Sequence, residues 1–323
     1  MASTPSHTPV TVLTGYLGSG KTTLLNRILN EAHGRRYAVI VNEFGEIGID
    51  NDLVVNADEE IFEMNNGCVC CTVRGDLIRV LHGLMRRRRR FDGILLETTG
   101  LADPAPVAQT FFVDEKVRRR MKLDAIVAVT DAKHLLQDID HAHEAQEQLA
   151  FADVILLNKT DLVSEKELTQ VRARIASINP YATLYPTERC SVGLEKILGK
   201  DAFNLDRILE LEPNFLEETH EHGHDRQLRS VSLVAEQPLS PHRLIPWIEF
   251  VVRHFGPDIL RMKGIVAMKD DDQRFVIQGV HMLVEGAHQR RWGAHEKRES
   301  RLVFIGRNLP QLVLQEGFQS CYA

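Results

Sequence analysis

Three cysteines crowd into four positions, with Cys68, Cys70 and Cys71 forming a C-x-C-C pattern. Thiolates are soft ligands that suit Zn²⁺, whose structural sites are tetrahedral. Three thiolates leave one coordination position for a carboxylate, a histidine, a water or a ligand from a client protein. The pattern therefore predicts a transition-metal site with an incomplete protein shell, which helps transfer of the metal. Three buried, reduced cysteines are the alternative, although a polar Asn-Gly-Cys turn is a poor core pattern.

The cysteines follow a segment that satisfies the phosphate-loop pattern G-x-x-x-x-G-K-[ST] in full, Gly15–Thr22. Glycines let successive N–H groups face phosphate oxygens, and the helix that follows adds a partial positive charge. Lys21 should reach the β and γ phosphates, and the Thr22 hydroxyl should bind Mg²⁺. A plain glycine-rich turn between a strand and a helix is the alternative. The residues predicted to bind nucleotide here are Gly15, Gly18, Ser19, Gly20, Lys21, Thr22 and Thr23.

An apolar run ends at Glu97 and is followed by Thr98, Thr99 and Gly100. Glu97 is predicted to be the acid on the magnesium side of the site. The N–H of Gly100 can meet the γ-phosphate, so this turn should move after hydrolysis. Lys21, Glu97 and Gly100 are thus candidate catalytic residues. Taken alone, Glu97 also fits an acid that merely caps a strand.

The choice of base is predicted from Asn158, Lys159 and Asp161, which form an N-K-x-D motif after another apolar run. The Asp161 carboxylate can accept hydrogen bonds from N1–H and the exocyclic amine of guanine. Adenine offers no matching pair of donors, and an unmatched buried polar group is costly. GTP and GDP are therefore the expected nucleotides. The polar stretch Thr187–Ser191 is placed to close over the base.

Composition limits the class of protein that must position these residues. A chain of 323 residues has room for about two domains, and 43% hydrophobic residues are ordinary for a globular protein. A net charge of −6 creates no overall field that attracts nucleic acid or anionic lipid. We see no apolar run near the roughly 20 residues that cross a bilayer, and no signal peptide. We therefore expect a cytoplasmic protein without nucleic-acid or membrane partners, in which Cys190 and Cys321 are structural or incidental.

The first 200 residues alternate short apolar runs with helical stretches. This alternation predicts an α/β fold of the P-loop NTPase type, with a mostly parallel sheet covered by helices on both faces. Strands are expected at Val10–Thr14, Tyr37–Asn42, Gly93–Glu97, Ala125–Thr130 and Asp153–Leu157, and helices near 22–33, 75–85, 105–121, 143–150 and 164–178.

The composition changes at residues 210–227, where acidic residues, Pro213 and alternating histidines replace the periodic pattern. We interpret 1–209 as the P-loop domain, 210–227 as a linker and 228–323 as a smaller α+β C-terminal domain. The linker histidines His220, His222 and His224 can capture Zn²⁺, Ni²⁺ or Co²⁺, and a solvated linker fits them equally well. The expected C-terminal elements are strands at Arg229–Ala235, Ile259–Met268, Arg274–Val280 and Arg301–Ile305, and helices near 241–254 and 309–316.

In combination, the motifs resemble those of the CobW-like branch of the P-loop GTPases, which serve as metal chaperones and metal-insertion proteins. The resemblance spans nearly the whole chain. It implies a GTPase whose C-x-C-C cysteines bind a transition metal, usually Zn²⁺, and whose nucleotide state controls metal holding or release. The segments that carry it are Gly15–Thr22, Asn42–Asp50, Asn66–Cys71, Glu97–Pro104, Asn158–Asp161, Arg261–Gly264, Gln278–Val280 and Leu302–Gly306.

Asn42–Asp50 follows the second expected strand and is placed to act as a switch loop. Glu43 and Glu46 can complete the shell of the transition metal, and Asp50 can contact Mg²⁺ or orient the attacking water. Acids in a surface loop are also often simply solvated.

The sequence thus predicts a Mg²⁺-dependent GTPase that couples GTP hydrolysis to transfer of Zn²⁺ to a client metalloprotein. Co²⁺ or another divalent metal is left open as the cargo, as is a homo-oligomer. Two alternatives remain: a nucleotide-dependent module that binds a client with little turnover, and a zinc storage or sensing protein.

Overall fold

The computed structural model describes residues 7–31, 34–43, 60–65, 71–87, 91–202, 228–293 and 296–323, of which 42–43, 60–65 and 71–74 are described by their backbone alone. The chain divides into two compact units. Met1–Arg174 and Ala182–Phe203 form the first unit, and Ile175–Tyr181 and Asn204–Ala323 form the second.

The first unit is built on a seven-stranded sheet with the strand order β3-β2-β4-β1-β5-β6-β7. All of its strand pairs are parallel, as predicted. Since parallel strands place their carboxyl ends at one edge, the loops that follow β1, β4, β5 and β6 meet there. The strands are β1 (Thr8–Thr14), β2 (Tyr37–Glu43), β3 (Glu60–Asn65), β4 (Gly93–Glu97), β5 (Met121–Asp131), β6 (Val154–Asn158) and β7 (Thr183–Pro186).

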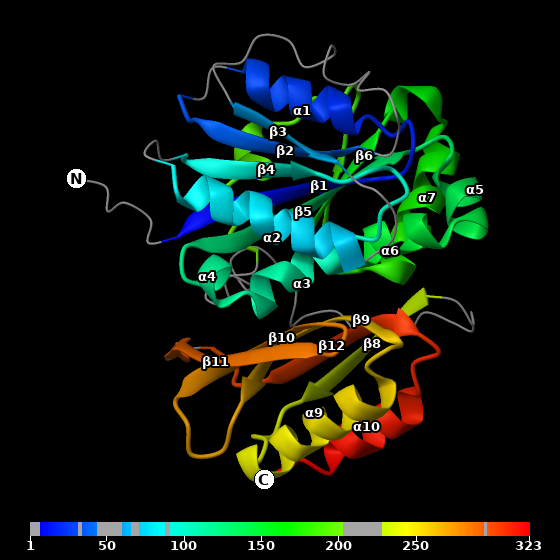
Figure 1. Ribbon diagram of the computed structural model, residues 1–323. Coiled ribbons are helices and arrows are strands. Elements are labelled where there is room, and N and C mark those ends of the chain that lie inside the picture. Colours follow the sequence, from blue (N-terminus) through cyan, green and yellow to red (C-terminus); the bar gives the residue numbers. More distant parts are fainter. Residues whose placement is uncertain are drawn as a thin grey trace. The chain divides into compact units, whose positions relative to one another are not determined.

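Helices cover both faces of this sheet, as Figure 1 shows. In α1 the buried residues Leu24, Leu25 and Ile28 form one apolar stripe, which holds the helix and the loop before it against the sheet. The helices are α1 (Lys21–Asn30), α2 (Cys71–Met85), α3 (Ala105–Val113), α4 (Glu115–Arg118), α5 (Leu135–His141), α6 (His143–Phe151) and α7 (Glu165–Ile178).

Several elements differ from the sequence-based expectation. The helix expected near 105–121 ends at Val113, because Asp114 adopts an extended conformation and its side chain caps α4 by accepting the Val117 N–H. As a result β5 starts at Met121, four residues before the expected strand. Strands β3 and β7 were not predicted, since glutamates interrupt the apolar pattern of one and the other is only 4 residues long. Helix α5 was not predicted either.

The second unit contains a five-stranded antiparallel sheet in the order β11-β10-β9-β12-β8. Two helices pack on it, and Trp247 stacks edge-on against Phe304 with ring centroids 6.1 Å apart. This confirms the smaller α+β domain, although β11 was missed because its sequence is mostly polar. The elements are β8 (Leu228–Ala235), α9 (Pro241–Phe255), β9 (Ile259–Ala267), β10 (Gln273–Val280), β11 (Leu283–Arg291), β12 (Ser300–Arg307) and α10 (Gln311–Gln319).

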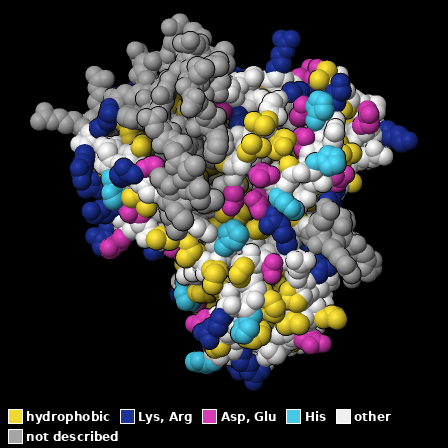
Figure 2. Space-filling model, turned by 45° about the vertical axis from the view of Figure 1, so that its right-hand side comes forward, with side chains coloured by type: hydrophobic (Ala, Val, Ile, Leu, Met, Phe, Trp, Pro, Cys, Tyr) yellow, Lys and Arg dark blue, Asp and Glu magenta, His cyan; other side chains and the backbone are white. Residues whose placement is uncertain are grey.

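Two further observations concern the apolar length of the helices and the charges on the surface. No helix in the described part of the chain combines the length and apolarity that a membrane span requires. On the face drawn in Figure 2, positive, negative and histidine side chains are interspersed over the described surface.

Candidate functional site

The loop between β1 and α1 has a backbone that only glycine accommodates at two positions. Gly15 has a φ of +142°, and a Cβ there would lie 2.1 Å from the carbonyl oxygen of Val129. Gly20 has a φ of +114°, and a Cβ there would lie 2.7 Å from the Asn158 amide nitrogen. The loop therefore lies tightly against Val129 of β5 and Asn158 of β6, where a side chain at either position would not fit.

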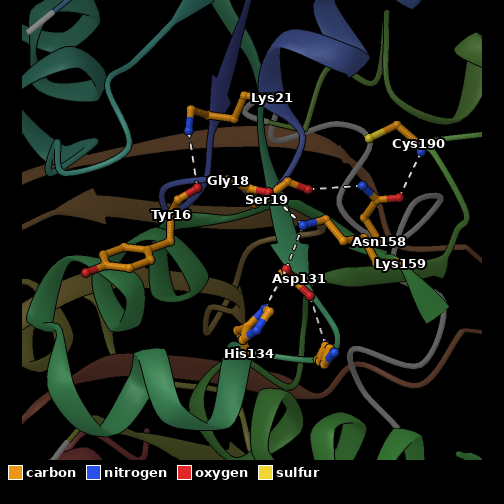
Figure 3. Close-up of polar contacts among 10 residues, drawn as sticks. Tyr16, Gly18, Ser19, Lys21, Asp131, His134, Asn158, Lys159 and Cys190 are labelled. Carbon is orange, nitrogen blue, oxygen red and sulfur yellow. Dashed lines mark hydrogen bonds and ion pairs between the residues drawn. The ribbon is translucent and has the colours of Figure 1, made fainter. Parts of the chain in front are cut away.

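Lys21 lies across this loop rather than pointing into solvent. Its Nζ donates to the carbonyl oxygen of Gly15 at 2.8 Å and is 3.3 Å from that of Tyr16, as Figure 3 shows for Tyr16. Among the described residues, the buried Ser19 hydroxyl is an oxygen without a hydrogen-bond partner. A cradle of glycines with an ammonium group and an unsatisfied hydroxyl fits the phosphates of a nucleotide.

The two residues predicted for Mg²⁺ are neighbours. The Thr22 hydroxyl lies 3.4 Å from Oε1 of Glu97, which is buried at the end of β4. A hydroxyl and a carboxylate together are the oxygen donors that Mg²⁺ prefers. The donor set therefore fits a magnesium ion held beside the phosphate loop.

The turn after Glu97 is fixed to the strand that precedes the phosphate loop. Thr98 donates its N–H to Leu13 at 2.9 Å, and its hydroxyl to that of Thr14 at 3.0 Å. A Cβ on Gly100 would lie 2.9 Å from the backbone nitrogen of Leu17. Gly100 therefore packs directly against the phosphate loop, where its lack of a side chain permits the close approach.

Asn158 joins the phosphate loop to the segment after β7. Its amide donates to Ser19 O at 3.0 Å, and its carbonyl accepts from the N–H of Cys190 at 2.8 Å. The Thr187 hydroxyl lies 3.3 Å from the same carbonyl. Two residues of the predicted base-closing stretch, Thr187 and Cys190, are thus attached to the first residue of the N-K-x-D motif. Asp161, in a short 3-10 turn, is exposed.

Lys159 is held by a residue that sequence reasoning missed, Asp131 at the end of β5. Lys159 Nζ donates to Gly18 O at 2.8 Å and to Asp131 Oδ2 at 2.7 Å (Figure 3). The Asp131 carboxylate also accepts the Lys133 N–H at 2.9 Å and contacts His134 Nδ1 at 2.9 Å. Burial alone would raise the pKa of Asp131, but the hydrogen bonds from Lys159 and His134 outweigh it and lower this pKa.

Cys190 was expected to be structural or incidental, and it lies in the wall of this site. Its Sγ is 3.4 Å from Gly20 O, and its carbonyl accepts a hydrogen bond from the Arg27 guanidinium. Burial raises the pKa of the Cys190 thiol to about 11, so the thiol stays protonated at neutral pH. Cys321 is buried in the second unit, with its Sγ 3.2 Å from Gly317 O.

Most residues of the predicted transition-metal site lie outside the described part of the chain. These are Cys68, Cys70 and Glu46. Asp50, predicted to contact Mg²⁺ or orient the attacking water, and the linker histidines 220, 222 and 224 also lie outside it. Cys71 is the first residue of α2 and Glu43 the last of β2, each described by its backbone alone. The remaining described residues contain no group of three or more His, Cys, Asp or Glu arranged to hold a metal ion.

The backbone nevertheless brings the starts of these loops together. In the pairing of β2 with β3, Glu43 stands opposite Asn65, the residue before the Asn66–Cys70 loop. On its other side β2 pairs with β4, where Val41 stands opposite Glu97. The cysteine loop and the Asn42–Asp50 loop therefore leave the same sheet edge as the phosphate loop.

Replacing Asp131 with asparagine should weaken the binding of both GTP and GDP by about tenfold, because Lys159 loses its charged partner below the phosphate loop. Dissociation constants from calorimetry measure this effect. Asp140→Asn, which neutralises an exposed acid on α5, is the matched control. Equal nucleotide affinity in the two variants would show that Asp131 does not support the site.

Comparisons with known proteins agree with this geometry. Residues 9–186 match the family described as CobW/HypB/UreG, nucleotide-binding domain, and residues 228–322 match the cobalamin synthesis protein cobW C-terminal domain. The zinc chaperone YjiA of Escherichia coli is 35% identical over 96% of this chain and 97% of its own length. The zinc-regulated GTPase metalloprotein activator 1 of Schizosaccharomyces pombe is 34% identical over 96% and 85%.

A solved structure extends the similarity to both units. The crystal structure of Zn(II)-bound YjiA GTPase from E. coli has a TM-score of 0.80 to this chain, at 29% identity, and covers 98% of this chain and 99% of its own. By sequence and by structure, the chain belongs to the CobW/HypB/UreG family and carries its nucleotide-binding domain followed by a CobW C-terminal domain.

Proposed function

We propose that this protein is a GTP-hydrolysing zinc chaperone, which holds Zn²⁺ through Cys68, Cys70 and Cys71 and passes it to a client metalloprotein. The relatives named as zinc chaperones and as a zinc-regulated GTPase support this proposal, since they match nearly the whole chain. GTP, GDP and Mg²⁺ are its cofactors, and Zn²⁺ is its cargo.

The observation that carries the proposal is the order of the parallel strands that lead into the loops. β3 lies three strand spacings from β1, roughly 14 Å along the sheet. The cysteine loop leaves the carboxyl end of β3, and the phosphate loop leaves that of β1. Strand β2, which ends at Glu43 and leads into the Asn42–Asp50 loop, lies between β3 and β1 in the sheet order. A rearrangement that the γ-phosphate imposes can therefore reach the cysteines through directly paired strands.

On the nucleotide side, each residue has a role that follows from its contacts. Lys21 supplies positive charge where the β and γ phosphates lie, and Thr22 with Glu97 holds Mg²⁺. Gly100 offers its N–H to the γ-phosphate and Asp50 orients the attacking water. Asn158, Lys159 and Asp161 select guanine.

On the metal side, Glu43 and Glu46 complete the shell that the three thiolates leave open. Both belong to the Asn42–Asp50 loop, which also carries Asp50. Because one loop serves both sites, a change of nucleotide changes the number or position of the metal ligands. Only such differential binding can convert hydrolysis into release of the ion.

We assign residues 1–209 to the GTPase domain, 210–227 to the linker and 228–323 to the C-terminal domain. The family matches at 9–186 and 228–322 support these boundaries. The C-terminal domain is the candidate for docking the client.

Zinc binding by the purified protein, measured by competition with a chromogenic chelator, tests the metal site. We expect one tightly bound Zn²⁺ and at least about a hundredfold weaker binding in Cys70→Ser, since a thiolate ligand is lost. Cys321→Ser, a thiol in the core of the second unit, should bind zinc like the wild type. Equal affinity in Cys70→Ser and the wild type would rule out the C-x-C-C site.

A further inference from the structure

The turn that follows β4 is held by a side chain from α6. The amide nitrogen of Gln148 lies 3.0 Å from the carbonyl oxygen of Gly100 and 3.2 Å from that of Ala102. Gln148 is only 1% exposed. Both N–H bonds of its amide are thereby used on two carbonyls of one turn, which is the arrangement that a buried amide requires.

These two bonds fix peptide orientation. In a trans peptide the C=O and the N–H point in opposite directions. Holding the Gly100 carbonyl toward Gln148 therefore turns the N–H of Leu101 away from α6, and the bond to Ala102 does the same for the N–H of Asp103. The amide of Gln148 thus sets the direction of the turn's own donors.

The turn also has an internal bond, from the Ala102 N–H to Thr99 O at 3.1 Å, and further anchors at its two ends. Thr98 ties the start of the turn to Leu13 and Thr14 of β1. At the far end, Asp103 accepts the N–H of Ala105 at 2.8 Å, which begins α3. Between these ends, Gly100 packs on Leu17 of the phosphate loop. The centre of the turn is therefore clamped between the phosphate loop and Gln148.

We propose that Gln148 is a positioning residue for GTP hydrolysis, whose amide fixes the Gly100–Leu101 and Ala102–Asp103 peptides and so holds the turn in which the Gly100 N–H meets the γ-phosphate. The proposal rests on the proposed function, in which this turn contacts the γ-phosphate. GDP has no γ-phosphate, so Gln148 acts on turnover of GTP and not on the binding of GDP.

α6 supplies a matched control for the test. Gln146 is also buried there, and its amide donates to Ile139 O at 2.7 Å, between α6 and α5. Gln146→Leu removes a buried amide from the same helix without touching the turn. Comparing it with Gln148→Leu separates a loss of stability from a loss of positioning.

We expect Gln148→Leu to lower kcat for GTP by about tenfold while the Kd for GDP stays within about twofold of the wild type. Gln146→Leu should keep the wild-type kcat even if its melting temperature falls by as much as that of Gln148→Leu. Gln148→Glu adds a second readout, because a carboxylate repels the two carbonyls whereas its protonated form donates to one of them. The kcat of Gln148→Glu relative to the wild type should therefore rise as the pH falls from about 8 to about 6.

Three results would overturn the inference: an unchanged kcat in Gln148→Leu, an equal fall in kcat in Gln146→Leu, or a weakening of GDP binding that matches the loss of turnover. Absence of GTP hydrolysis by the wild-type chain is a separate outcome. It would overturn the proposed function, and this inference with it.

Discussion

Replacing Lys21 with alanine is expected to lower the rate of GTP hydrolysis by about 10²- to 10³-fold. Its ammonium group already lies across the phosphate loop, with Nζ 2.8 Å from Gly15 O. From there it can meet the β and γ phosphates, where negative charge develops during transfer. A neutral methyl group leaves that charge uncompensated.

Phosphate release at saturating GTP and Mg²⁺ measures this effect as kcat. Lys166→Ala, on the exposed surface of α7, makes the same change of charge away from the site and should turn over like the wild type. A Lys21→Ala variant that retains more than half of the wild-type kcat would contradict the role of the phosphate loop in catalysis.

Replacing Asp161 with asparagine should weaken GTP binding by about a hundredfold and create binding of xanthosine triphosphate. In the proposed role the carboxylate accepts two hydrogen bonds from guanine, each worth about 1.5–3 kcal/mol because the acceptor is charged. Asparagine can instead donate to the carbonyl oxygen that xanthine carries in place of the exocyclic amine. The hydrogen bonds from Thr160 to Thr187 O hold the turn that positions residue 161.

Competition of GTP, ATP and xanthosine triphosphate against a fluorescent nucleotide measures this exchange of preference. Asp140→Asn should keep the wild-type order, in which GTP binds most tightly. If Asp161→Asn also prefers GTP over xanthosine triphosphate, the carboxylate does not read the base.

The fold and the nucleotide motifs were predictable because their signals are local. Gly15–Thr22, Glu97 and Asn158 each follow an apolar run, and parallel strands bring such positions to one edge. The structure confirms the predicted parallel sheet and the predicted α+β second unit. The proximity of Thr22 to Glu97 follows from the pairing of β1 with β4.

The supporting residues could not be predicted because their partners are distant in sequence. Asp131 meets Lys159 28 positions later, Cys190 meets Asn158 across 32 positions and Gln148 meets Gly100 across 48. A single acid, thiol or amide carries no periodic signal. Of these three residues, Asp131 had a different signal that could have found it: like Glu97, it is an acid at the end of a buried strand.

The coupling of the two sites can be measured as zinc affinity in two nucleotide states. Titrating Zn²⁺ into the protein saturated with a non-hydrolysable GTP analogue, and then with GDP, gives two dissociation constants, with Cys70→Ser as the control that lacks the site. We expect them to differ by about tenfold or more, and we expect zinc to change the affinity for the GTP analogue relative to GDP by the same factor. Equal zinc affinity in the two states would contradict the coupling of the two sites.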